Sequence, residues 1–162
     1  MSKLTLILMR HGEASMGAGT DHARALTSTG SAESKKMGLH VGRFAKDCCR
    51  AIVSDATRTK QTAEQVFEHF RPSAVHFEPK LYSANNSNDM AEAITRHVKP
   101  SDKTVCVIGH NPILSEMATT LSGQSYNFSP AEFVVLSLDS DSWHTALQSQ
   151  DCWAPVSEEK SI

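Results

Sequence analysis

The apolar run Leu-Thr-Leu-Ile-Leu-Met at residues 4–9 is the feature that most constrains the fold of this chain. It has the length and composition of a buried β-strand, and it ends abruptly at Arg10, His11 and Gly12. In open α/β sheets, ligands bind outside the carboxyl ends of the strands. A cation, a titratable nitrogen and a flexible glycine at such an end indicate an anion site.

Strand-like and helix-like patterns alternate along the rest of the chain. Further short apolar runs predict strands at residues 51–53, 74–77 and 104–108, and apolar residues at helical spacing predict helices between them. Expected N-caps are Thr27, Ser54 or Asp55, and Asn111, the last followed by Pro112 at the first helical position. Pro79 is expected to stop the third strand, with a polar loop at residues 82–88 after it, and two last strands at 132–138 and 143–148 to form a hairpin. These patterns predict an α/β fold: a single-domain, mainly parallel sheet with helices on both faces and a C-terminal hairpin.

Length and composition set the broad class. With 162 residues, 40% of them hydrophobic and 21% charged, we expect one domain at residues 1–155 and a disordered tail at 156–162. The net charge of -2 gives no general attraction to nucleic acid or to anionic membranes, and no apolar run is long enough to cross a bilayer. We therefore expect a cytoplasmic monomer with no nucleic-acid or membrane partner. Its thiols should be reduced, because Cys48, Cys49, Cys106 and Cys152 show no Cys-x-x-Cys spacing.

The strand ends carry charged and titratable side chains that should meet. In a parallel sheet the carboxyl ends share one edge, which brings together Arg10, His11, Arg58 and His110. Taken singly, an arginine is usually solvated and a histidine usually packs or caps, but two histidines and two arginines at one edge form an electropositive pocket. Such a pocket suits a phosphate, because the guanidinium fork can hold two oxygens at once.

Four motifs resemble one known family in its own order. Residues 10–13 (Arg-His-Gly-Glu) resemble the signature of the histidine phosphatase superfamily, in its phosphoglycerate mutase-like branch. Residues 24–30 resemble Arg-Pro-Leu-Thr-x-x-Gly of that branch, with Ala25 where proline is usual, and residues 54–62 resemble Ser-x-x-x-Arg-x-x-Gln-Thr. Residues 109–112 resemble its late Gly-His turn. Dispersed motifs in order are far more specific than Arg-His-Gly alone.

The resemblance implies a role for each of these residues. His11 would attack phosphorus and form a phosphohistidine intermediate, which water hydrolyses. Arg10, Arg58 and His110 would hold the phosphoryl oxygens as further catalytic residues. Substrate-binding contacts are expected from a final group of three: Arg24, Gly12 and Asn111. No cofactor or metal is expected, since the eight histidines supply no His-x-His or His-x-x-x-His pair.

A missing acid narrows the expected substrate. Related mutases carry a glutamate after a Pro-x-Leu-x pattern as proton donor, whereas here the pattern at residues 79–83 ends in Ser83. Phosphohistidine has a labile phosphorus–nitrogen bond and tolerates that loss, and a short chain with little cover over the site suits a protein surface as substrate. Both features resemble the SixA-type phosphohistidine phosphatases, which act on histidine-phosphorylated phosphotransfer domains. Glu13, Asp89 or Glu92 could still supply a proton.

Two alternatives stay open. One is a small-molecule phosphomonoesterase or mutase-like enzyme of the same superfamily. The other, of a different class, is a non-catalytic phosphate-binding module, against which the intact His11 and His110 argue.

Overall fold

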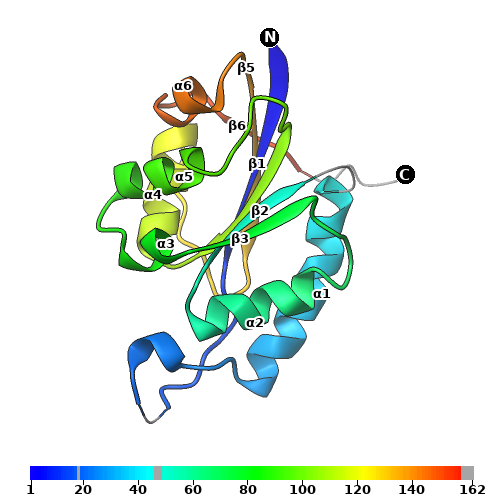
Figure 1. Cartoon of the computed structure of the whole chain (residues 1–162), viewed down its shortest axis with the longest axis vertical. Helices are drawn as coiled ribbons and strands as arrows, with labels where there is room; N and C mark the ends of the chain where they lie inside the picture. The colour runs from blue at the N-terminus through cyan, green and yellow to red at the C-terminus, as the bar shows by residue number, and fades with distance from the viewer. Residues whose placement is uncertain (18, 46–48, 158–162) are drawn as a thin grey trace.

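A six-stranded sheet forms the centre of the computed structural model, which describes residues 1–17, 19–45 and 49–157 (Figure 1). The strand order is β3-β2-β4-β1-β5-β6. β1 pairs in parallel with β4, and β2 in parallel with both β3 and β4, while β5 runs antiparallel to β1 and to β6. The strands are β1 (Ser2–Arg10), β2 (Arg50–Ser54), β3 (Ala74–Glu78), β4 (Thr104–Gly109), β5 (Phe133–Ser140) and β6 (Ala154–Pro155).

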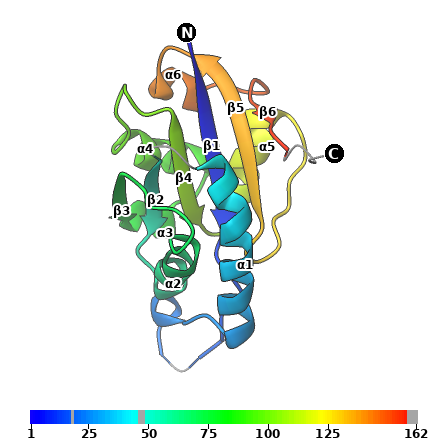
Figure 2. The same ribbon diagram turned by 90° about the vertical axis from the view of Figure 1, so that its right-hand side faces the viewer.

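Helices cover both faces of this sheet, as Figures 1 and 2 show. Alternate side chains of β1 and β4 point to opposite faces, so each strand contributes to two cores. On one face Ile7 and Ile108 pack with α1 and α2, and on the other Leu6 and Val107 pack with α4, α5 and α6. The helices are η1 (Asp21–Ala23, a 3-10 helix), α1 (Ser28–Phe44), α2 (Thr57–Val66), α3 (Pro79–Ser83), α4 (Ser87–Thr95), α5 (Ile113–Ser122) and α6 (Trp143–Leu147).

The predicted fold class is confirmed: the sheet is mainly parallel and has helices on both faces. Thr27 is also the N-cap of α1, since its side chain accepts a hydrogen bond from the backbone of Gly30. Within the described residues, no helix is both long enough and apolar enough to cross a membrane. Cys48 and residues 158–162 of the predicted tail lie outside the part of the chain that the structure describes.

The predicted C-terminal hairpin is wrong in its second strand. Residues 143–147 form helix α6, because Ser142 caps it and Trp143, Ala146 and Leu147 are buried at helical spacing. β5 pairs instead with β1 and with the two residues of β6. Just after β6, the amide of Val156 donates to the carbonyl of Val135 over 2.7 Å.

Three predicted element boundaries are also wrong. Helix α2 starts at Thr57 with Ala56 as N-cap rather than Ser54 or Asp55, because the buried Ser54 is still part of β2. Pro79 does stop β3 as predicted, but it is also the first residue of α3, with Glu78 as N-cap, so the loop predicted at residues 82–88 is mostly helix. Helix α5 starts one residue later than expected, with Pro112 as N-cap.

Candidate active site

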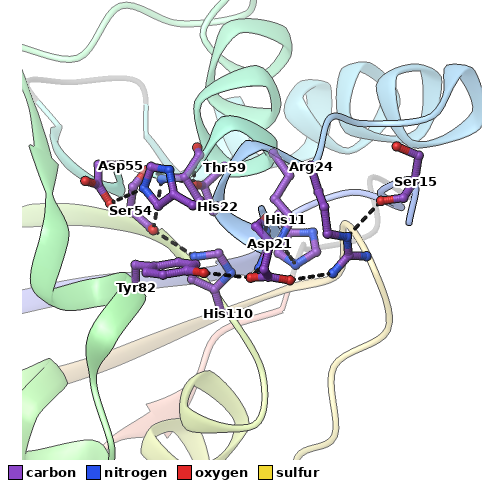
Figure 3. A network of polar contacts seen from close by, with 12 residues as sticks. His11, Ser15, Asp21, His22, Arg24, Ser54, Asp55, Thr59, Tyr82 and His110 are labelled. Carbon is purple, nitrogen blue, oxygen red and sulfur yellow. Dashed lines mark hydrogen bonds and ion pairs between the residues drawn. The ribbon is translucent and has the colours of Figure 1, made fainter. Parts of the chain in front are cut away.

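The strand ends of β1, β2 and β4 bring the predicted residues together at the carboxyl edge of the sheet. Figure 3 shows two of them, His11 and His110, lying close together. Arg10 ends β1 and His11 follows it, Arg58 lies in the first turn of α2, and His110 follows β4. The rings of His11 and His110 have centroids 5.3 Å apart. The Nε of Arg58 donates a hydrogen bond to Nε2 of His11 over 3.3 Å.

The contacts of His11 determine where its proton lies. Arg58 can only donate, so Nε2 of His11 must be the accepting, unprotonated nitrogen. The proton is then on Nδ1, which donates to the carbonyl of Gly12 over 2.6 Å. The side chain is buried, with 8% of the residue exposed. The ring therefore presents a lone pair on Nε2, which is what a nucleophile requires.

Both histidines are kept neutral. Burial, with the nearby charges of Arg58, Arg10 and Arg24, lowers the pKa of His11 from 6.5 to about 4, although the bond to Gly12 acts in the opposite direction. Burial, His11 and Arg58 lower the pKa of His110 to about 3. Near neutral pH the positive charge of the site thus comes from its arginines.

His110 is held from one side only. Its Nε2 lies 2.7 Å from the hydroxyl of Ser54, at the end of β2. Among the described residues, its Nδ1 and the Nε of Arg10 are buried without a hydrogen-bond partner. Buried polar atoms are normally paired, so these two nitrogens are hydrogen-bonding groups that the described part of the chain leaves unused.

Asp21 is the residue at this site that the sequence did not reveal. One carboxylate oxygen accepts from Arg24 over 3.0 Å; the other accepts from Arg58 over 3.1 Å and from the hydroxyl of Tyr82 over 2.8 Å. The backbone carbonyl of Asp21 accepts from the same Arg58 over 2.8 Å. Figure 3 shows Asp21 lying among Tyr82, Arg24 and the two histidines. The sequence feature that could have pointed to Asp21 is its position three residues before Arg24.

Tyr82 precedes Ser83, the position at which related mutases carry a glutamate. Its ring meets that of His110 edge-on with centroids 5.5 Å apart, and the Arg58 guanidinium lies 5.9 Å from its centroid. The three carboxylates named as possible acids lie elsewhere: Glu13 accepts from Thr27, Asp89 accepts from the backbone of Asn85, and Glu92 is exposed on α4. Asp21, rather than any of these three, is the carboxylate bonded to Arg24 and Arg58.

The three predicted substrate-binding residues have protein partners in this structure. The amide of Gly12 donates to Thr62 over 3.0 Å, and Asn111 donates to the carbonyl of Phe128 and accepts from Ser115. Arg24 donates through Nε to the carbonyl of Ser15 and through its terminal nitrogen to Asp21. Gly12 and Asn111 thus fix the backbone around the histidines, while Arg24 lies at the rim.

Only glycine fits at residue 12. A Cβ there would lie 2.6 Å from both the carbonyl oxygen of Gly30 and the hydroxyl of Ser34. The end of β1 therefore packs directly on the first turn of α1, which places His11 beside α2.

Fold and site together define an α/β protein with two neutral histidines and three arginines at the carboxyl edge of its sheet. Residues 6–90 match the family model described as histidine phosphatase superfamily (branch 1). The chain belongs to this superfamily, as its motifs suggested, and so to a class of hydrolases that includes phosphatases.

Individual relatives agree with this membership. The chain is 27% identical over 119 residues to the phosphohistidine phosphatase SixA of Escherichia coli, covering 73% of this chain and 74% of that protein. A solved structure from Nakamurella multipartitia, described with the name SixA, has a TM-score of 0.80 and 25% identity, covering 97% of this chain and 99% of that one. A phosphoglycerate mutase from Plasmodium falciparum shares the fold with a TM-score of 0.64 and 18% identity, covering 98% and 91%.

Proposed function

We propose that this protein is a phosphohistidine phosphatase that acts on a histidine-phosphorylated phosphotransfer protein, without a metal and through a covalent intermediate. The observation that carries the proposal is the neutral His11, whose Nε2 lone pair faces Arg58, with the charges of Arg10 and Arg24 nearby. Similarity to SixA of Escherichia coli supports the substrate class. Such an enzyme would serve signal transduction in the cytoplasm.

In the first step Nε2 of His11 attacks phosphorus as the bond from phosphorus to the leaving nitrogen breaks. The electron pair of that bond stays on the leaving imidazole, and His11 becomes a phosphoimidazolium. Its Nδ1–H remains on the carbonyl of Gly12, which stabilises the new positive charge. Arg10, Arg58 and His110 hold the phosphoryl oxygens, and the unpaired nitrogens of Arg10 and His110 are available for this.

In the second step water attacks the phosphorus of the intermediate. The bond from phosphorus to Nε2 breaks and its electron pair returns to His11. Inorganic phosphate leaves with both protons of the attacking water. His11 is then again neutral with its proton on Nδ1. The low pKa of the free ring, about 4, keeps Nε2 unprotonated for the next cycle.

The substrate class also fits the absence of a carboxylic acid at residue 83. An alkoxide leaving group needs a proton, whereas imidazole leaves more easily, and the α3 side chain that reaches the site is the phenol of Tyr82. Two alternatives to a phosphohistidine phosphatase are tested below. One is a small-molecule phosphomonoesterase of the same superfamily, and the other is a non-catalytic phosphate-binding module.

A comparison of substrates tests the proposal. The protein is incubated with a phosphorylated histidine phosphotransfer domain and, separately, with simple phosphomonoesters, and kcat/KM is measured for each. We expect the phosphorylated domain to be turned over faster. Faster turnover of the monoesters would favour the phosphomonoesterase, and turnover of neither would favour the binding module.

Rapid quenching tests the covalent step. With labelled phosphorylated domain, the label should appear on the enzyme in an acid-labile, base-stable linkage before phosphate is released. His11→Ala is the control that should carry no label.

A further inference from the structure

Asp21 is an acidic residue, with 54% of its side chain exposed, that is paired with two of the arginines around His11. Both its carboxylate oxygens and its carbonyl are bonded to Arg24, Arg58 and Tyr82, so it is fixed among the groups that surround His11. A negative charge at this position repels a phosphoryl group, which is a cost for any phosphatase. A compensating role in the reaction is therefore expected.

Proton donation is not that role. The hydrogen bonds from Tyr82, Arg24 and Arg58 hold the pKa of the Asp21 carboxyl well below its usual range, so the group stays ionised. An ionised carboxylate accepts hydrogen bonds and stabilises positive charge. The part of the substrate that meets Asp21 should accordingly carry an N–H group or a cation.

We propose that Asp21 is a specificity-determining residue, whose carboxylate accepts a hydrogen bond from the free ring N–H of the substrate's phosphohistidine. Tyr82 is its positioning residue, because its hydroxyl is bonded to the carboxylate and its ring lies beside His110. This inference rests on the proposed function.

The chemistry of the leaving group supports this assignment. Each phosphohistidine ring has one nitrogen bonded to phosphorus and one that is free. When the free nitrogen is protonated, the phosphorus–nitrogen bond can break with its electron pair staying on the nitrogen that carried phosphorus, and neutral imidazole is released. No proton has to reach the leaving nitrogen, so no general acid is required. Asp21 stabilises the protonated ring by accepting from that N–H.

The attacking ring has a matching arrangement. Nδ1–H of His11 donates to the carbonyl of Gly12 while Nε2 forms the new bond to phosphorus. Phosphoryl transfer then runs between two imidazoles, each with its second nitrogen held by an oxygen acceptor. A phosphomonoester has no N–H at this position, so Asp21 only repels it, and specificity comes from both effects.

A charge-neutral substitution tests the assignment in the full chain. Asp21→Asn is compared with wild type on a phosphorylated histidine phosphotransfer domain and on p-nitrophenyl phosphate. We expect kcat/KM for the domain to fall by about tenfold or more, the loss of one hydrogen bond between charged groups, while kcat/KM for p-nitrophenyl phosphate stays unchanged or rises. Asp21→Ala should show the same change in ratio. Asp55→Asn is the matched control, because Asp55 contacts His22 rather than an arginine, and it should leave the ratio unchanged.

Other outcomes overturn the inference in distinguishable ways. An equal fall on both substrates means that Asp21 only holds the arginines in place, and an equal rise means that it merely blocks the anion site. No change on the domain means that Asp21 does not contact the leaving ring. Failure of the proposed function appears earlier, as a wild type that prefers p-nitrophenyl phosphate, and the inference then fails with it.

Discussion

The Nε of Arg58 donates to Nε2 of His11 over 3.3 Å, while the two terminal nitrogens of the same guanidinium hold Asp21. One buried arginine thus sets the tautomer of His11 and joins it to Asp21 at the start of η1. For Nε of Arg58 to hold a phosphoryl oxygen, as the proposed function requires, it must give up its bond to His11.

Replacing His11 with alanine should abolish turnover. The nucleophile is lost while the arginines remain, so kcat/KM should fall by about three orders of magnitude or more, and the affinity for inorganic phosphate should change much less. Steady-state kinetics and calorimetric phosphate titration measure the two effects. Wild-type activity in this variant would contradict the nucleophile assignment.

Arg58→Lys should lower activity although the charge is kept. A lysine ammonium cannot present one nitrogen to His11 and two to Asp21, so kcat/KM should fall by about 100-fold. Arg71→Lys is the control, since Arg71 is exposed and lies after α2. If the two variants behave alike, charge rather than fork geometry is what the site needs.

The sequence predicted most of the sheet because the strands of an α/β fold are short, apolar and bounded by turn residues. The runs at residues 4–9 and 104–108 needed no tertiary context. The segment after residue 142 did. Its apolar residues Trp143, Ala146 and Leu147 have helical spacing, but a pattern of five residues is too short to exclude a strand without the packing and the Ser142 cap that the structure shows.

For the site, motif positions predicted the convergence of His11, Arg58 and His110, because parallel strands end at one edge. Asp21 was not predictable in the same way. It begins the three-residue helix η1 within a polar segment without periodicity, and its contact with Tyr82 joins residues 61 positions apart. Such contacts depend on how two short helices pack, and single-sequence patterns carry no information on that.

The two neutral histidines should make folding stability depend on pH. Their pKa values are about 4 and about 3 in the folded chain and near 6.5 when exposed, so the unfolded chain binds more protons as the pH falls below 6.5. The free energy of unfolding should therefore decrease on acidification, by up to about 1.4 kcal/mol per pH unit for each histidine, until the folded pKa values are reached.

Urea denaturation at a series of pH values from about 5 upward measures how the free energy of unfolding changes with pH. The double variant His11→Asn, His110→Asn should lose stability less steeply than wild type over that interval. His144→Asn is the control, because His144 is exposed on α6. Equal slopes for wild type and the double variant would mean that the folded histidines titrate normally.

A buried ion pair lies at the edge of the sheet opposite to the candidate active site, so its removal should change stability without changing activity. Nε of Arg50, at the start of β2, lies 2.6 Å from a carboxylate oxygen of Asp102, and 9% of each side chain is exposed. Asp102→Ala leaves the arginine buried without its carboxylate, so unfolding should become easier by about 3–5 kcal/mol. Far from His11, the change should leave kcat/KM unaltered at temperatures where the variant is folded.

The double variant Arg50→Met, Asp102→Leu distinguishes the reason for this loss. With both charges removed, no uncompensated charge stays buried. The free energy of unfolding should therefore return to the wild-type value or exceed it. Chemical denaturation measures all three proteins, and activity on the phosphorylated domain confirms that the site is intact. A loss below about 1 kcal/mol in Asp102→Ala would mean that water reaches Arg50 and solvates it in place of the carboxylate.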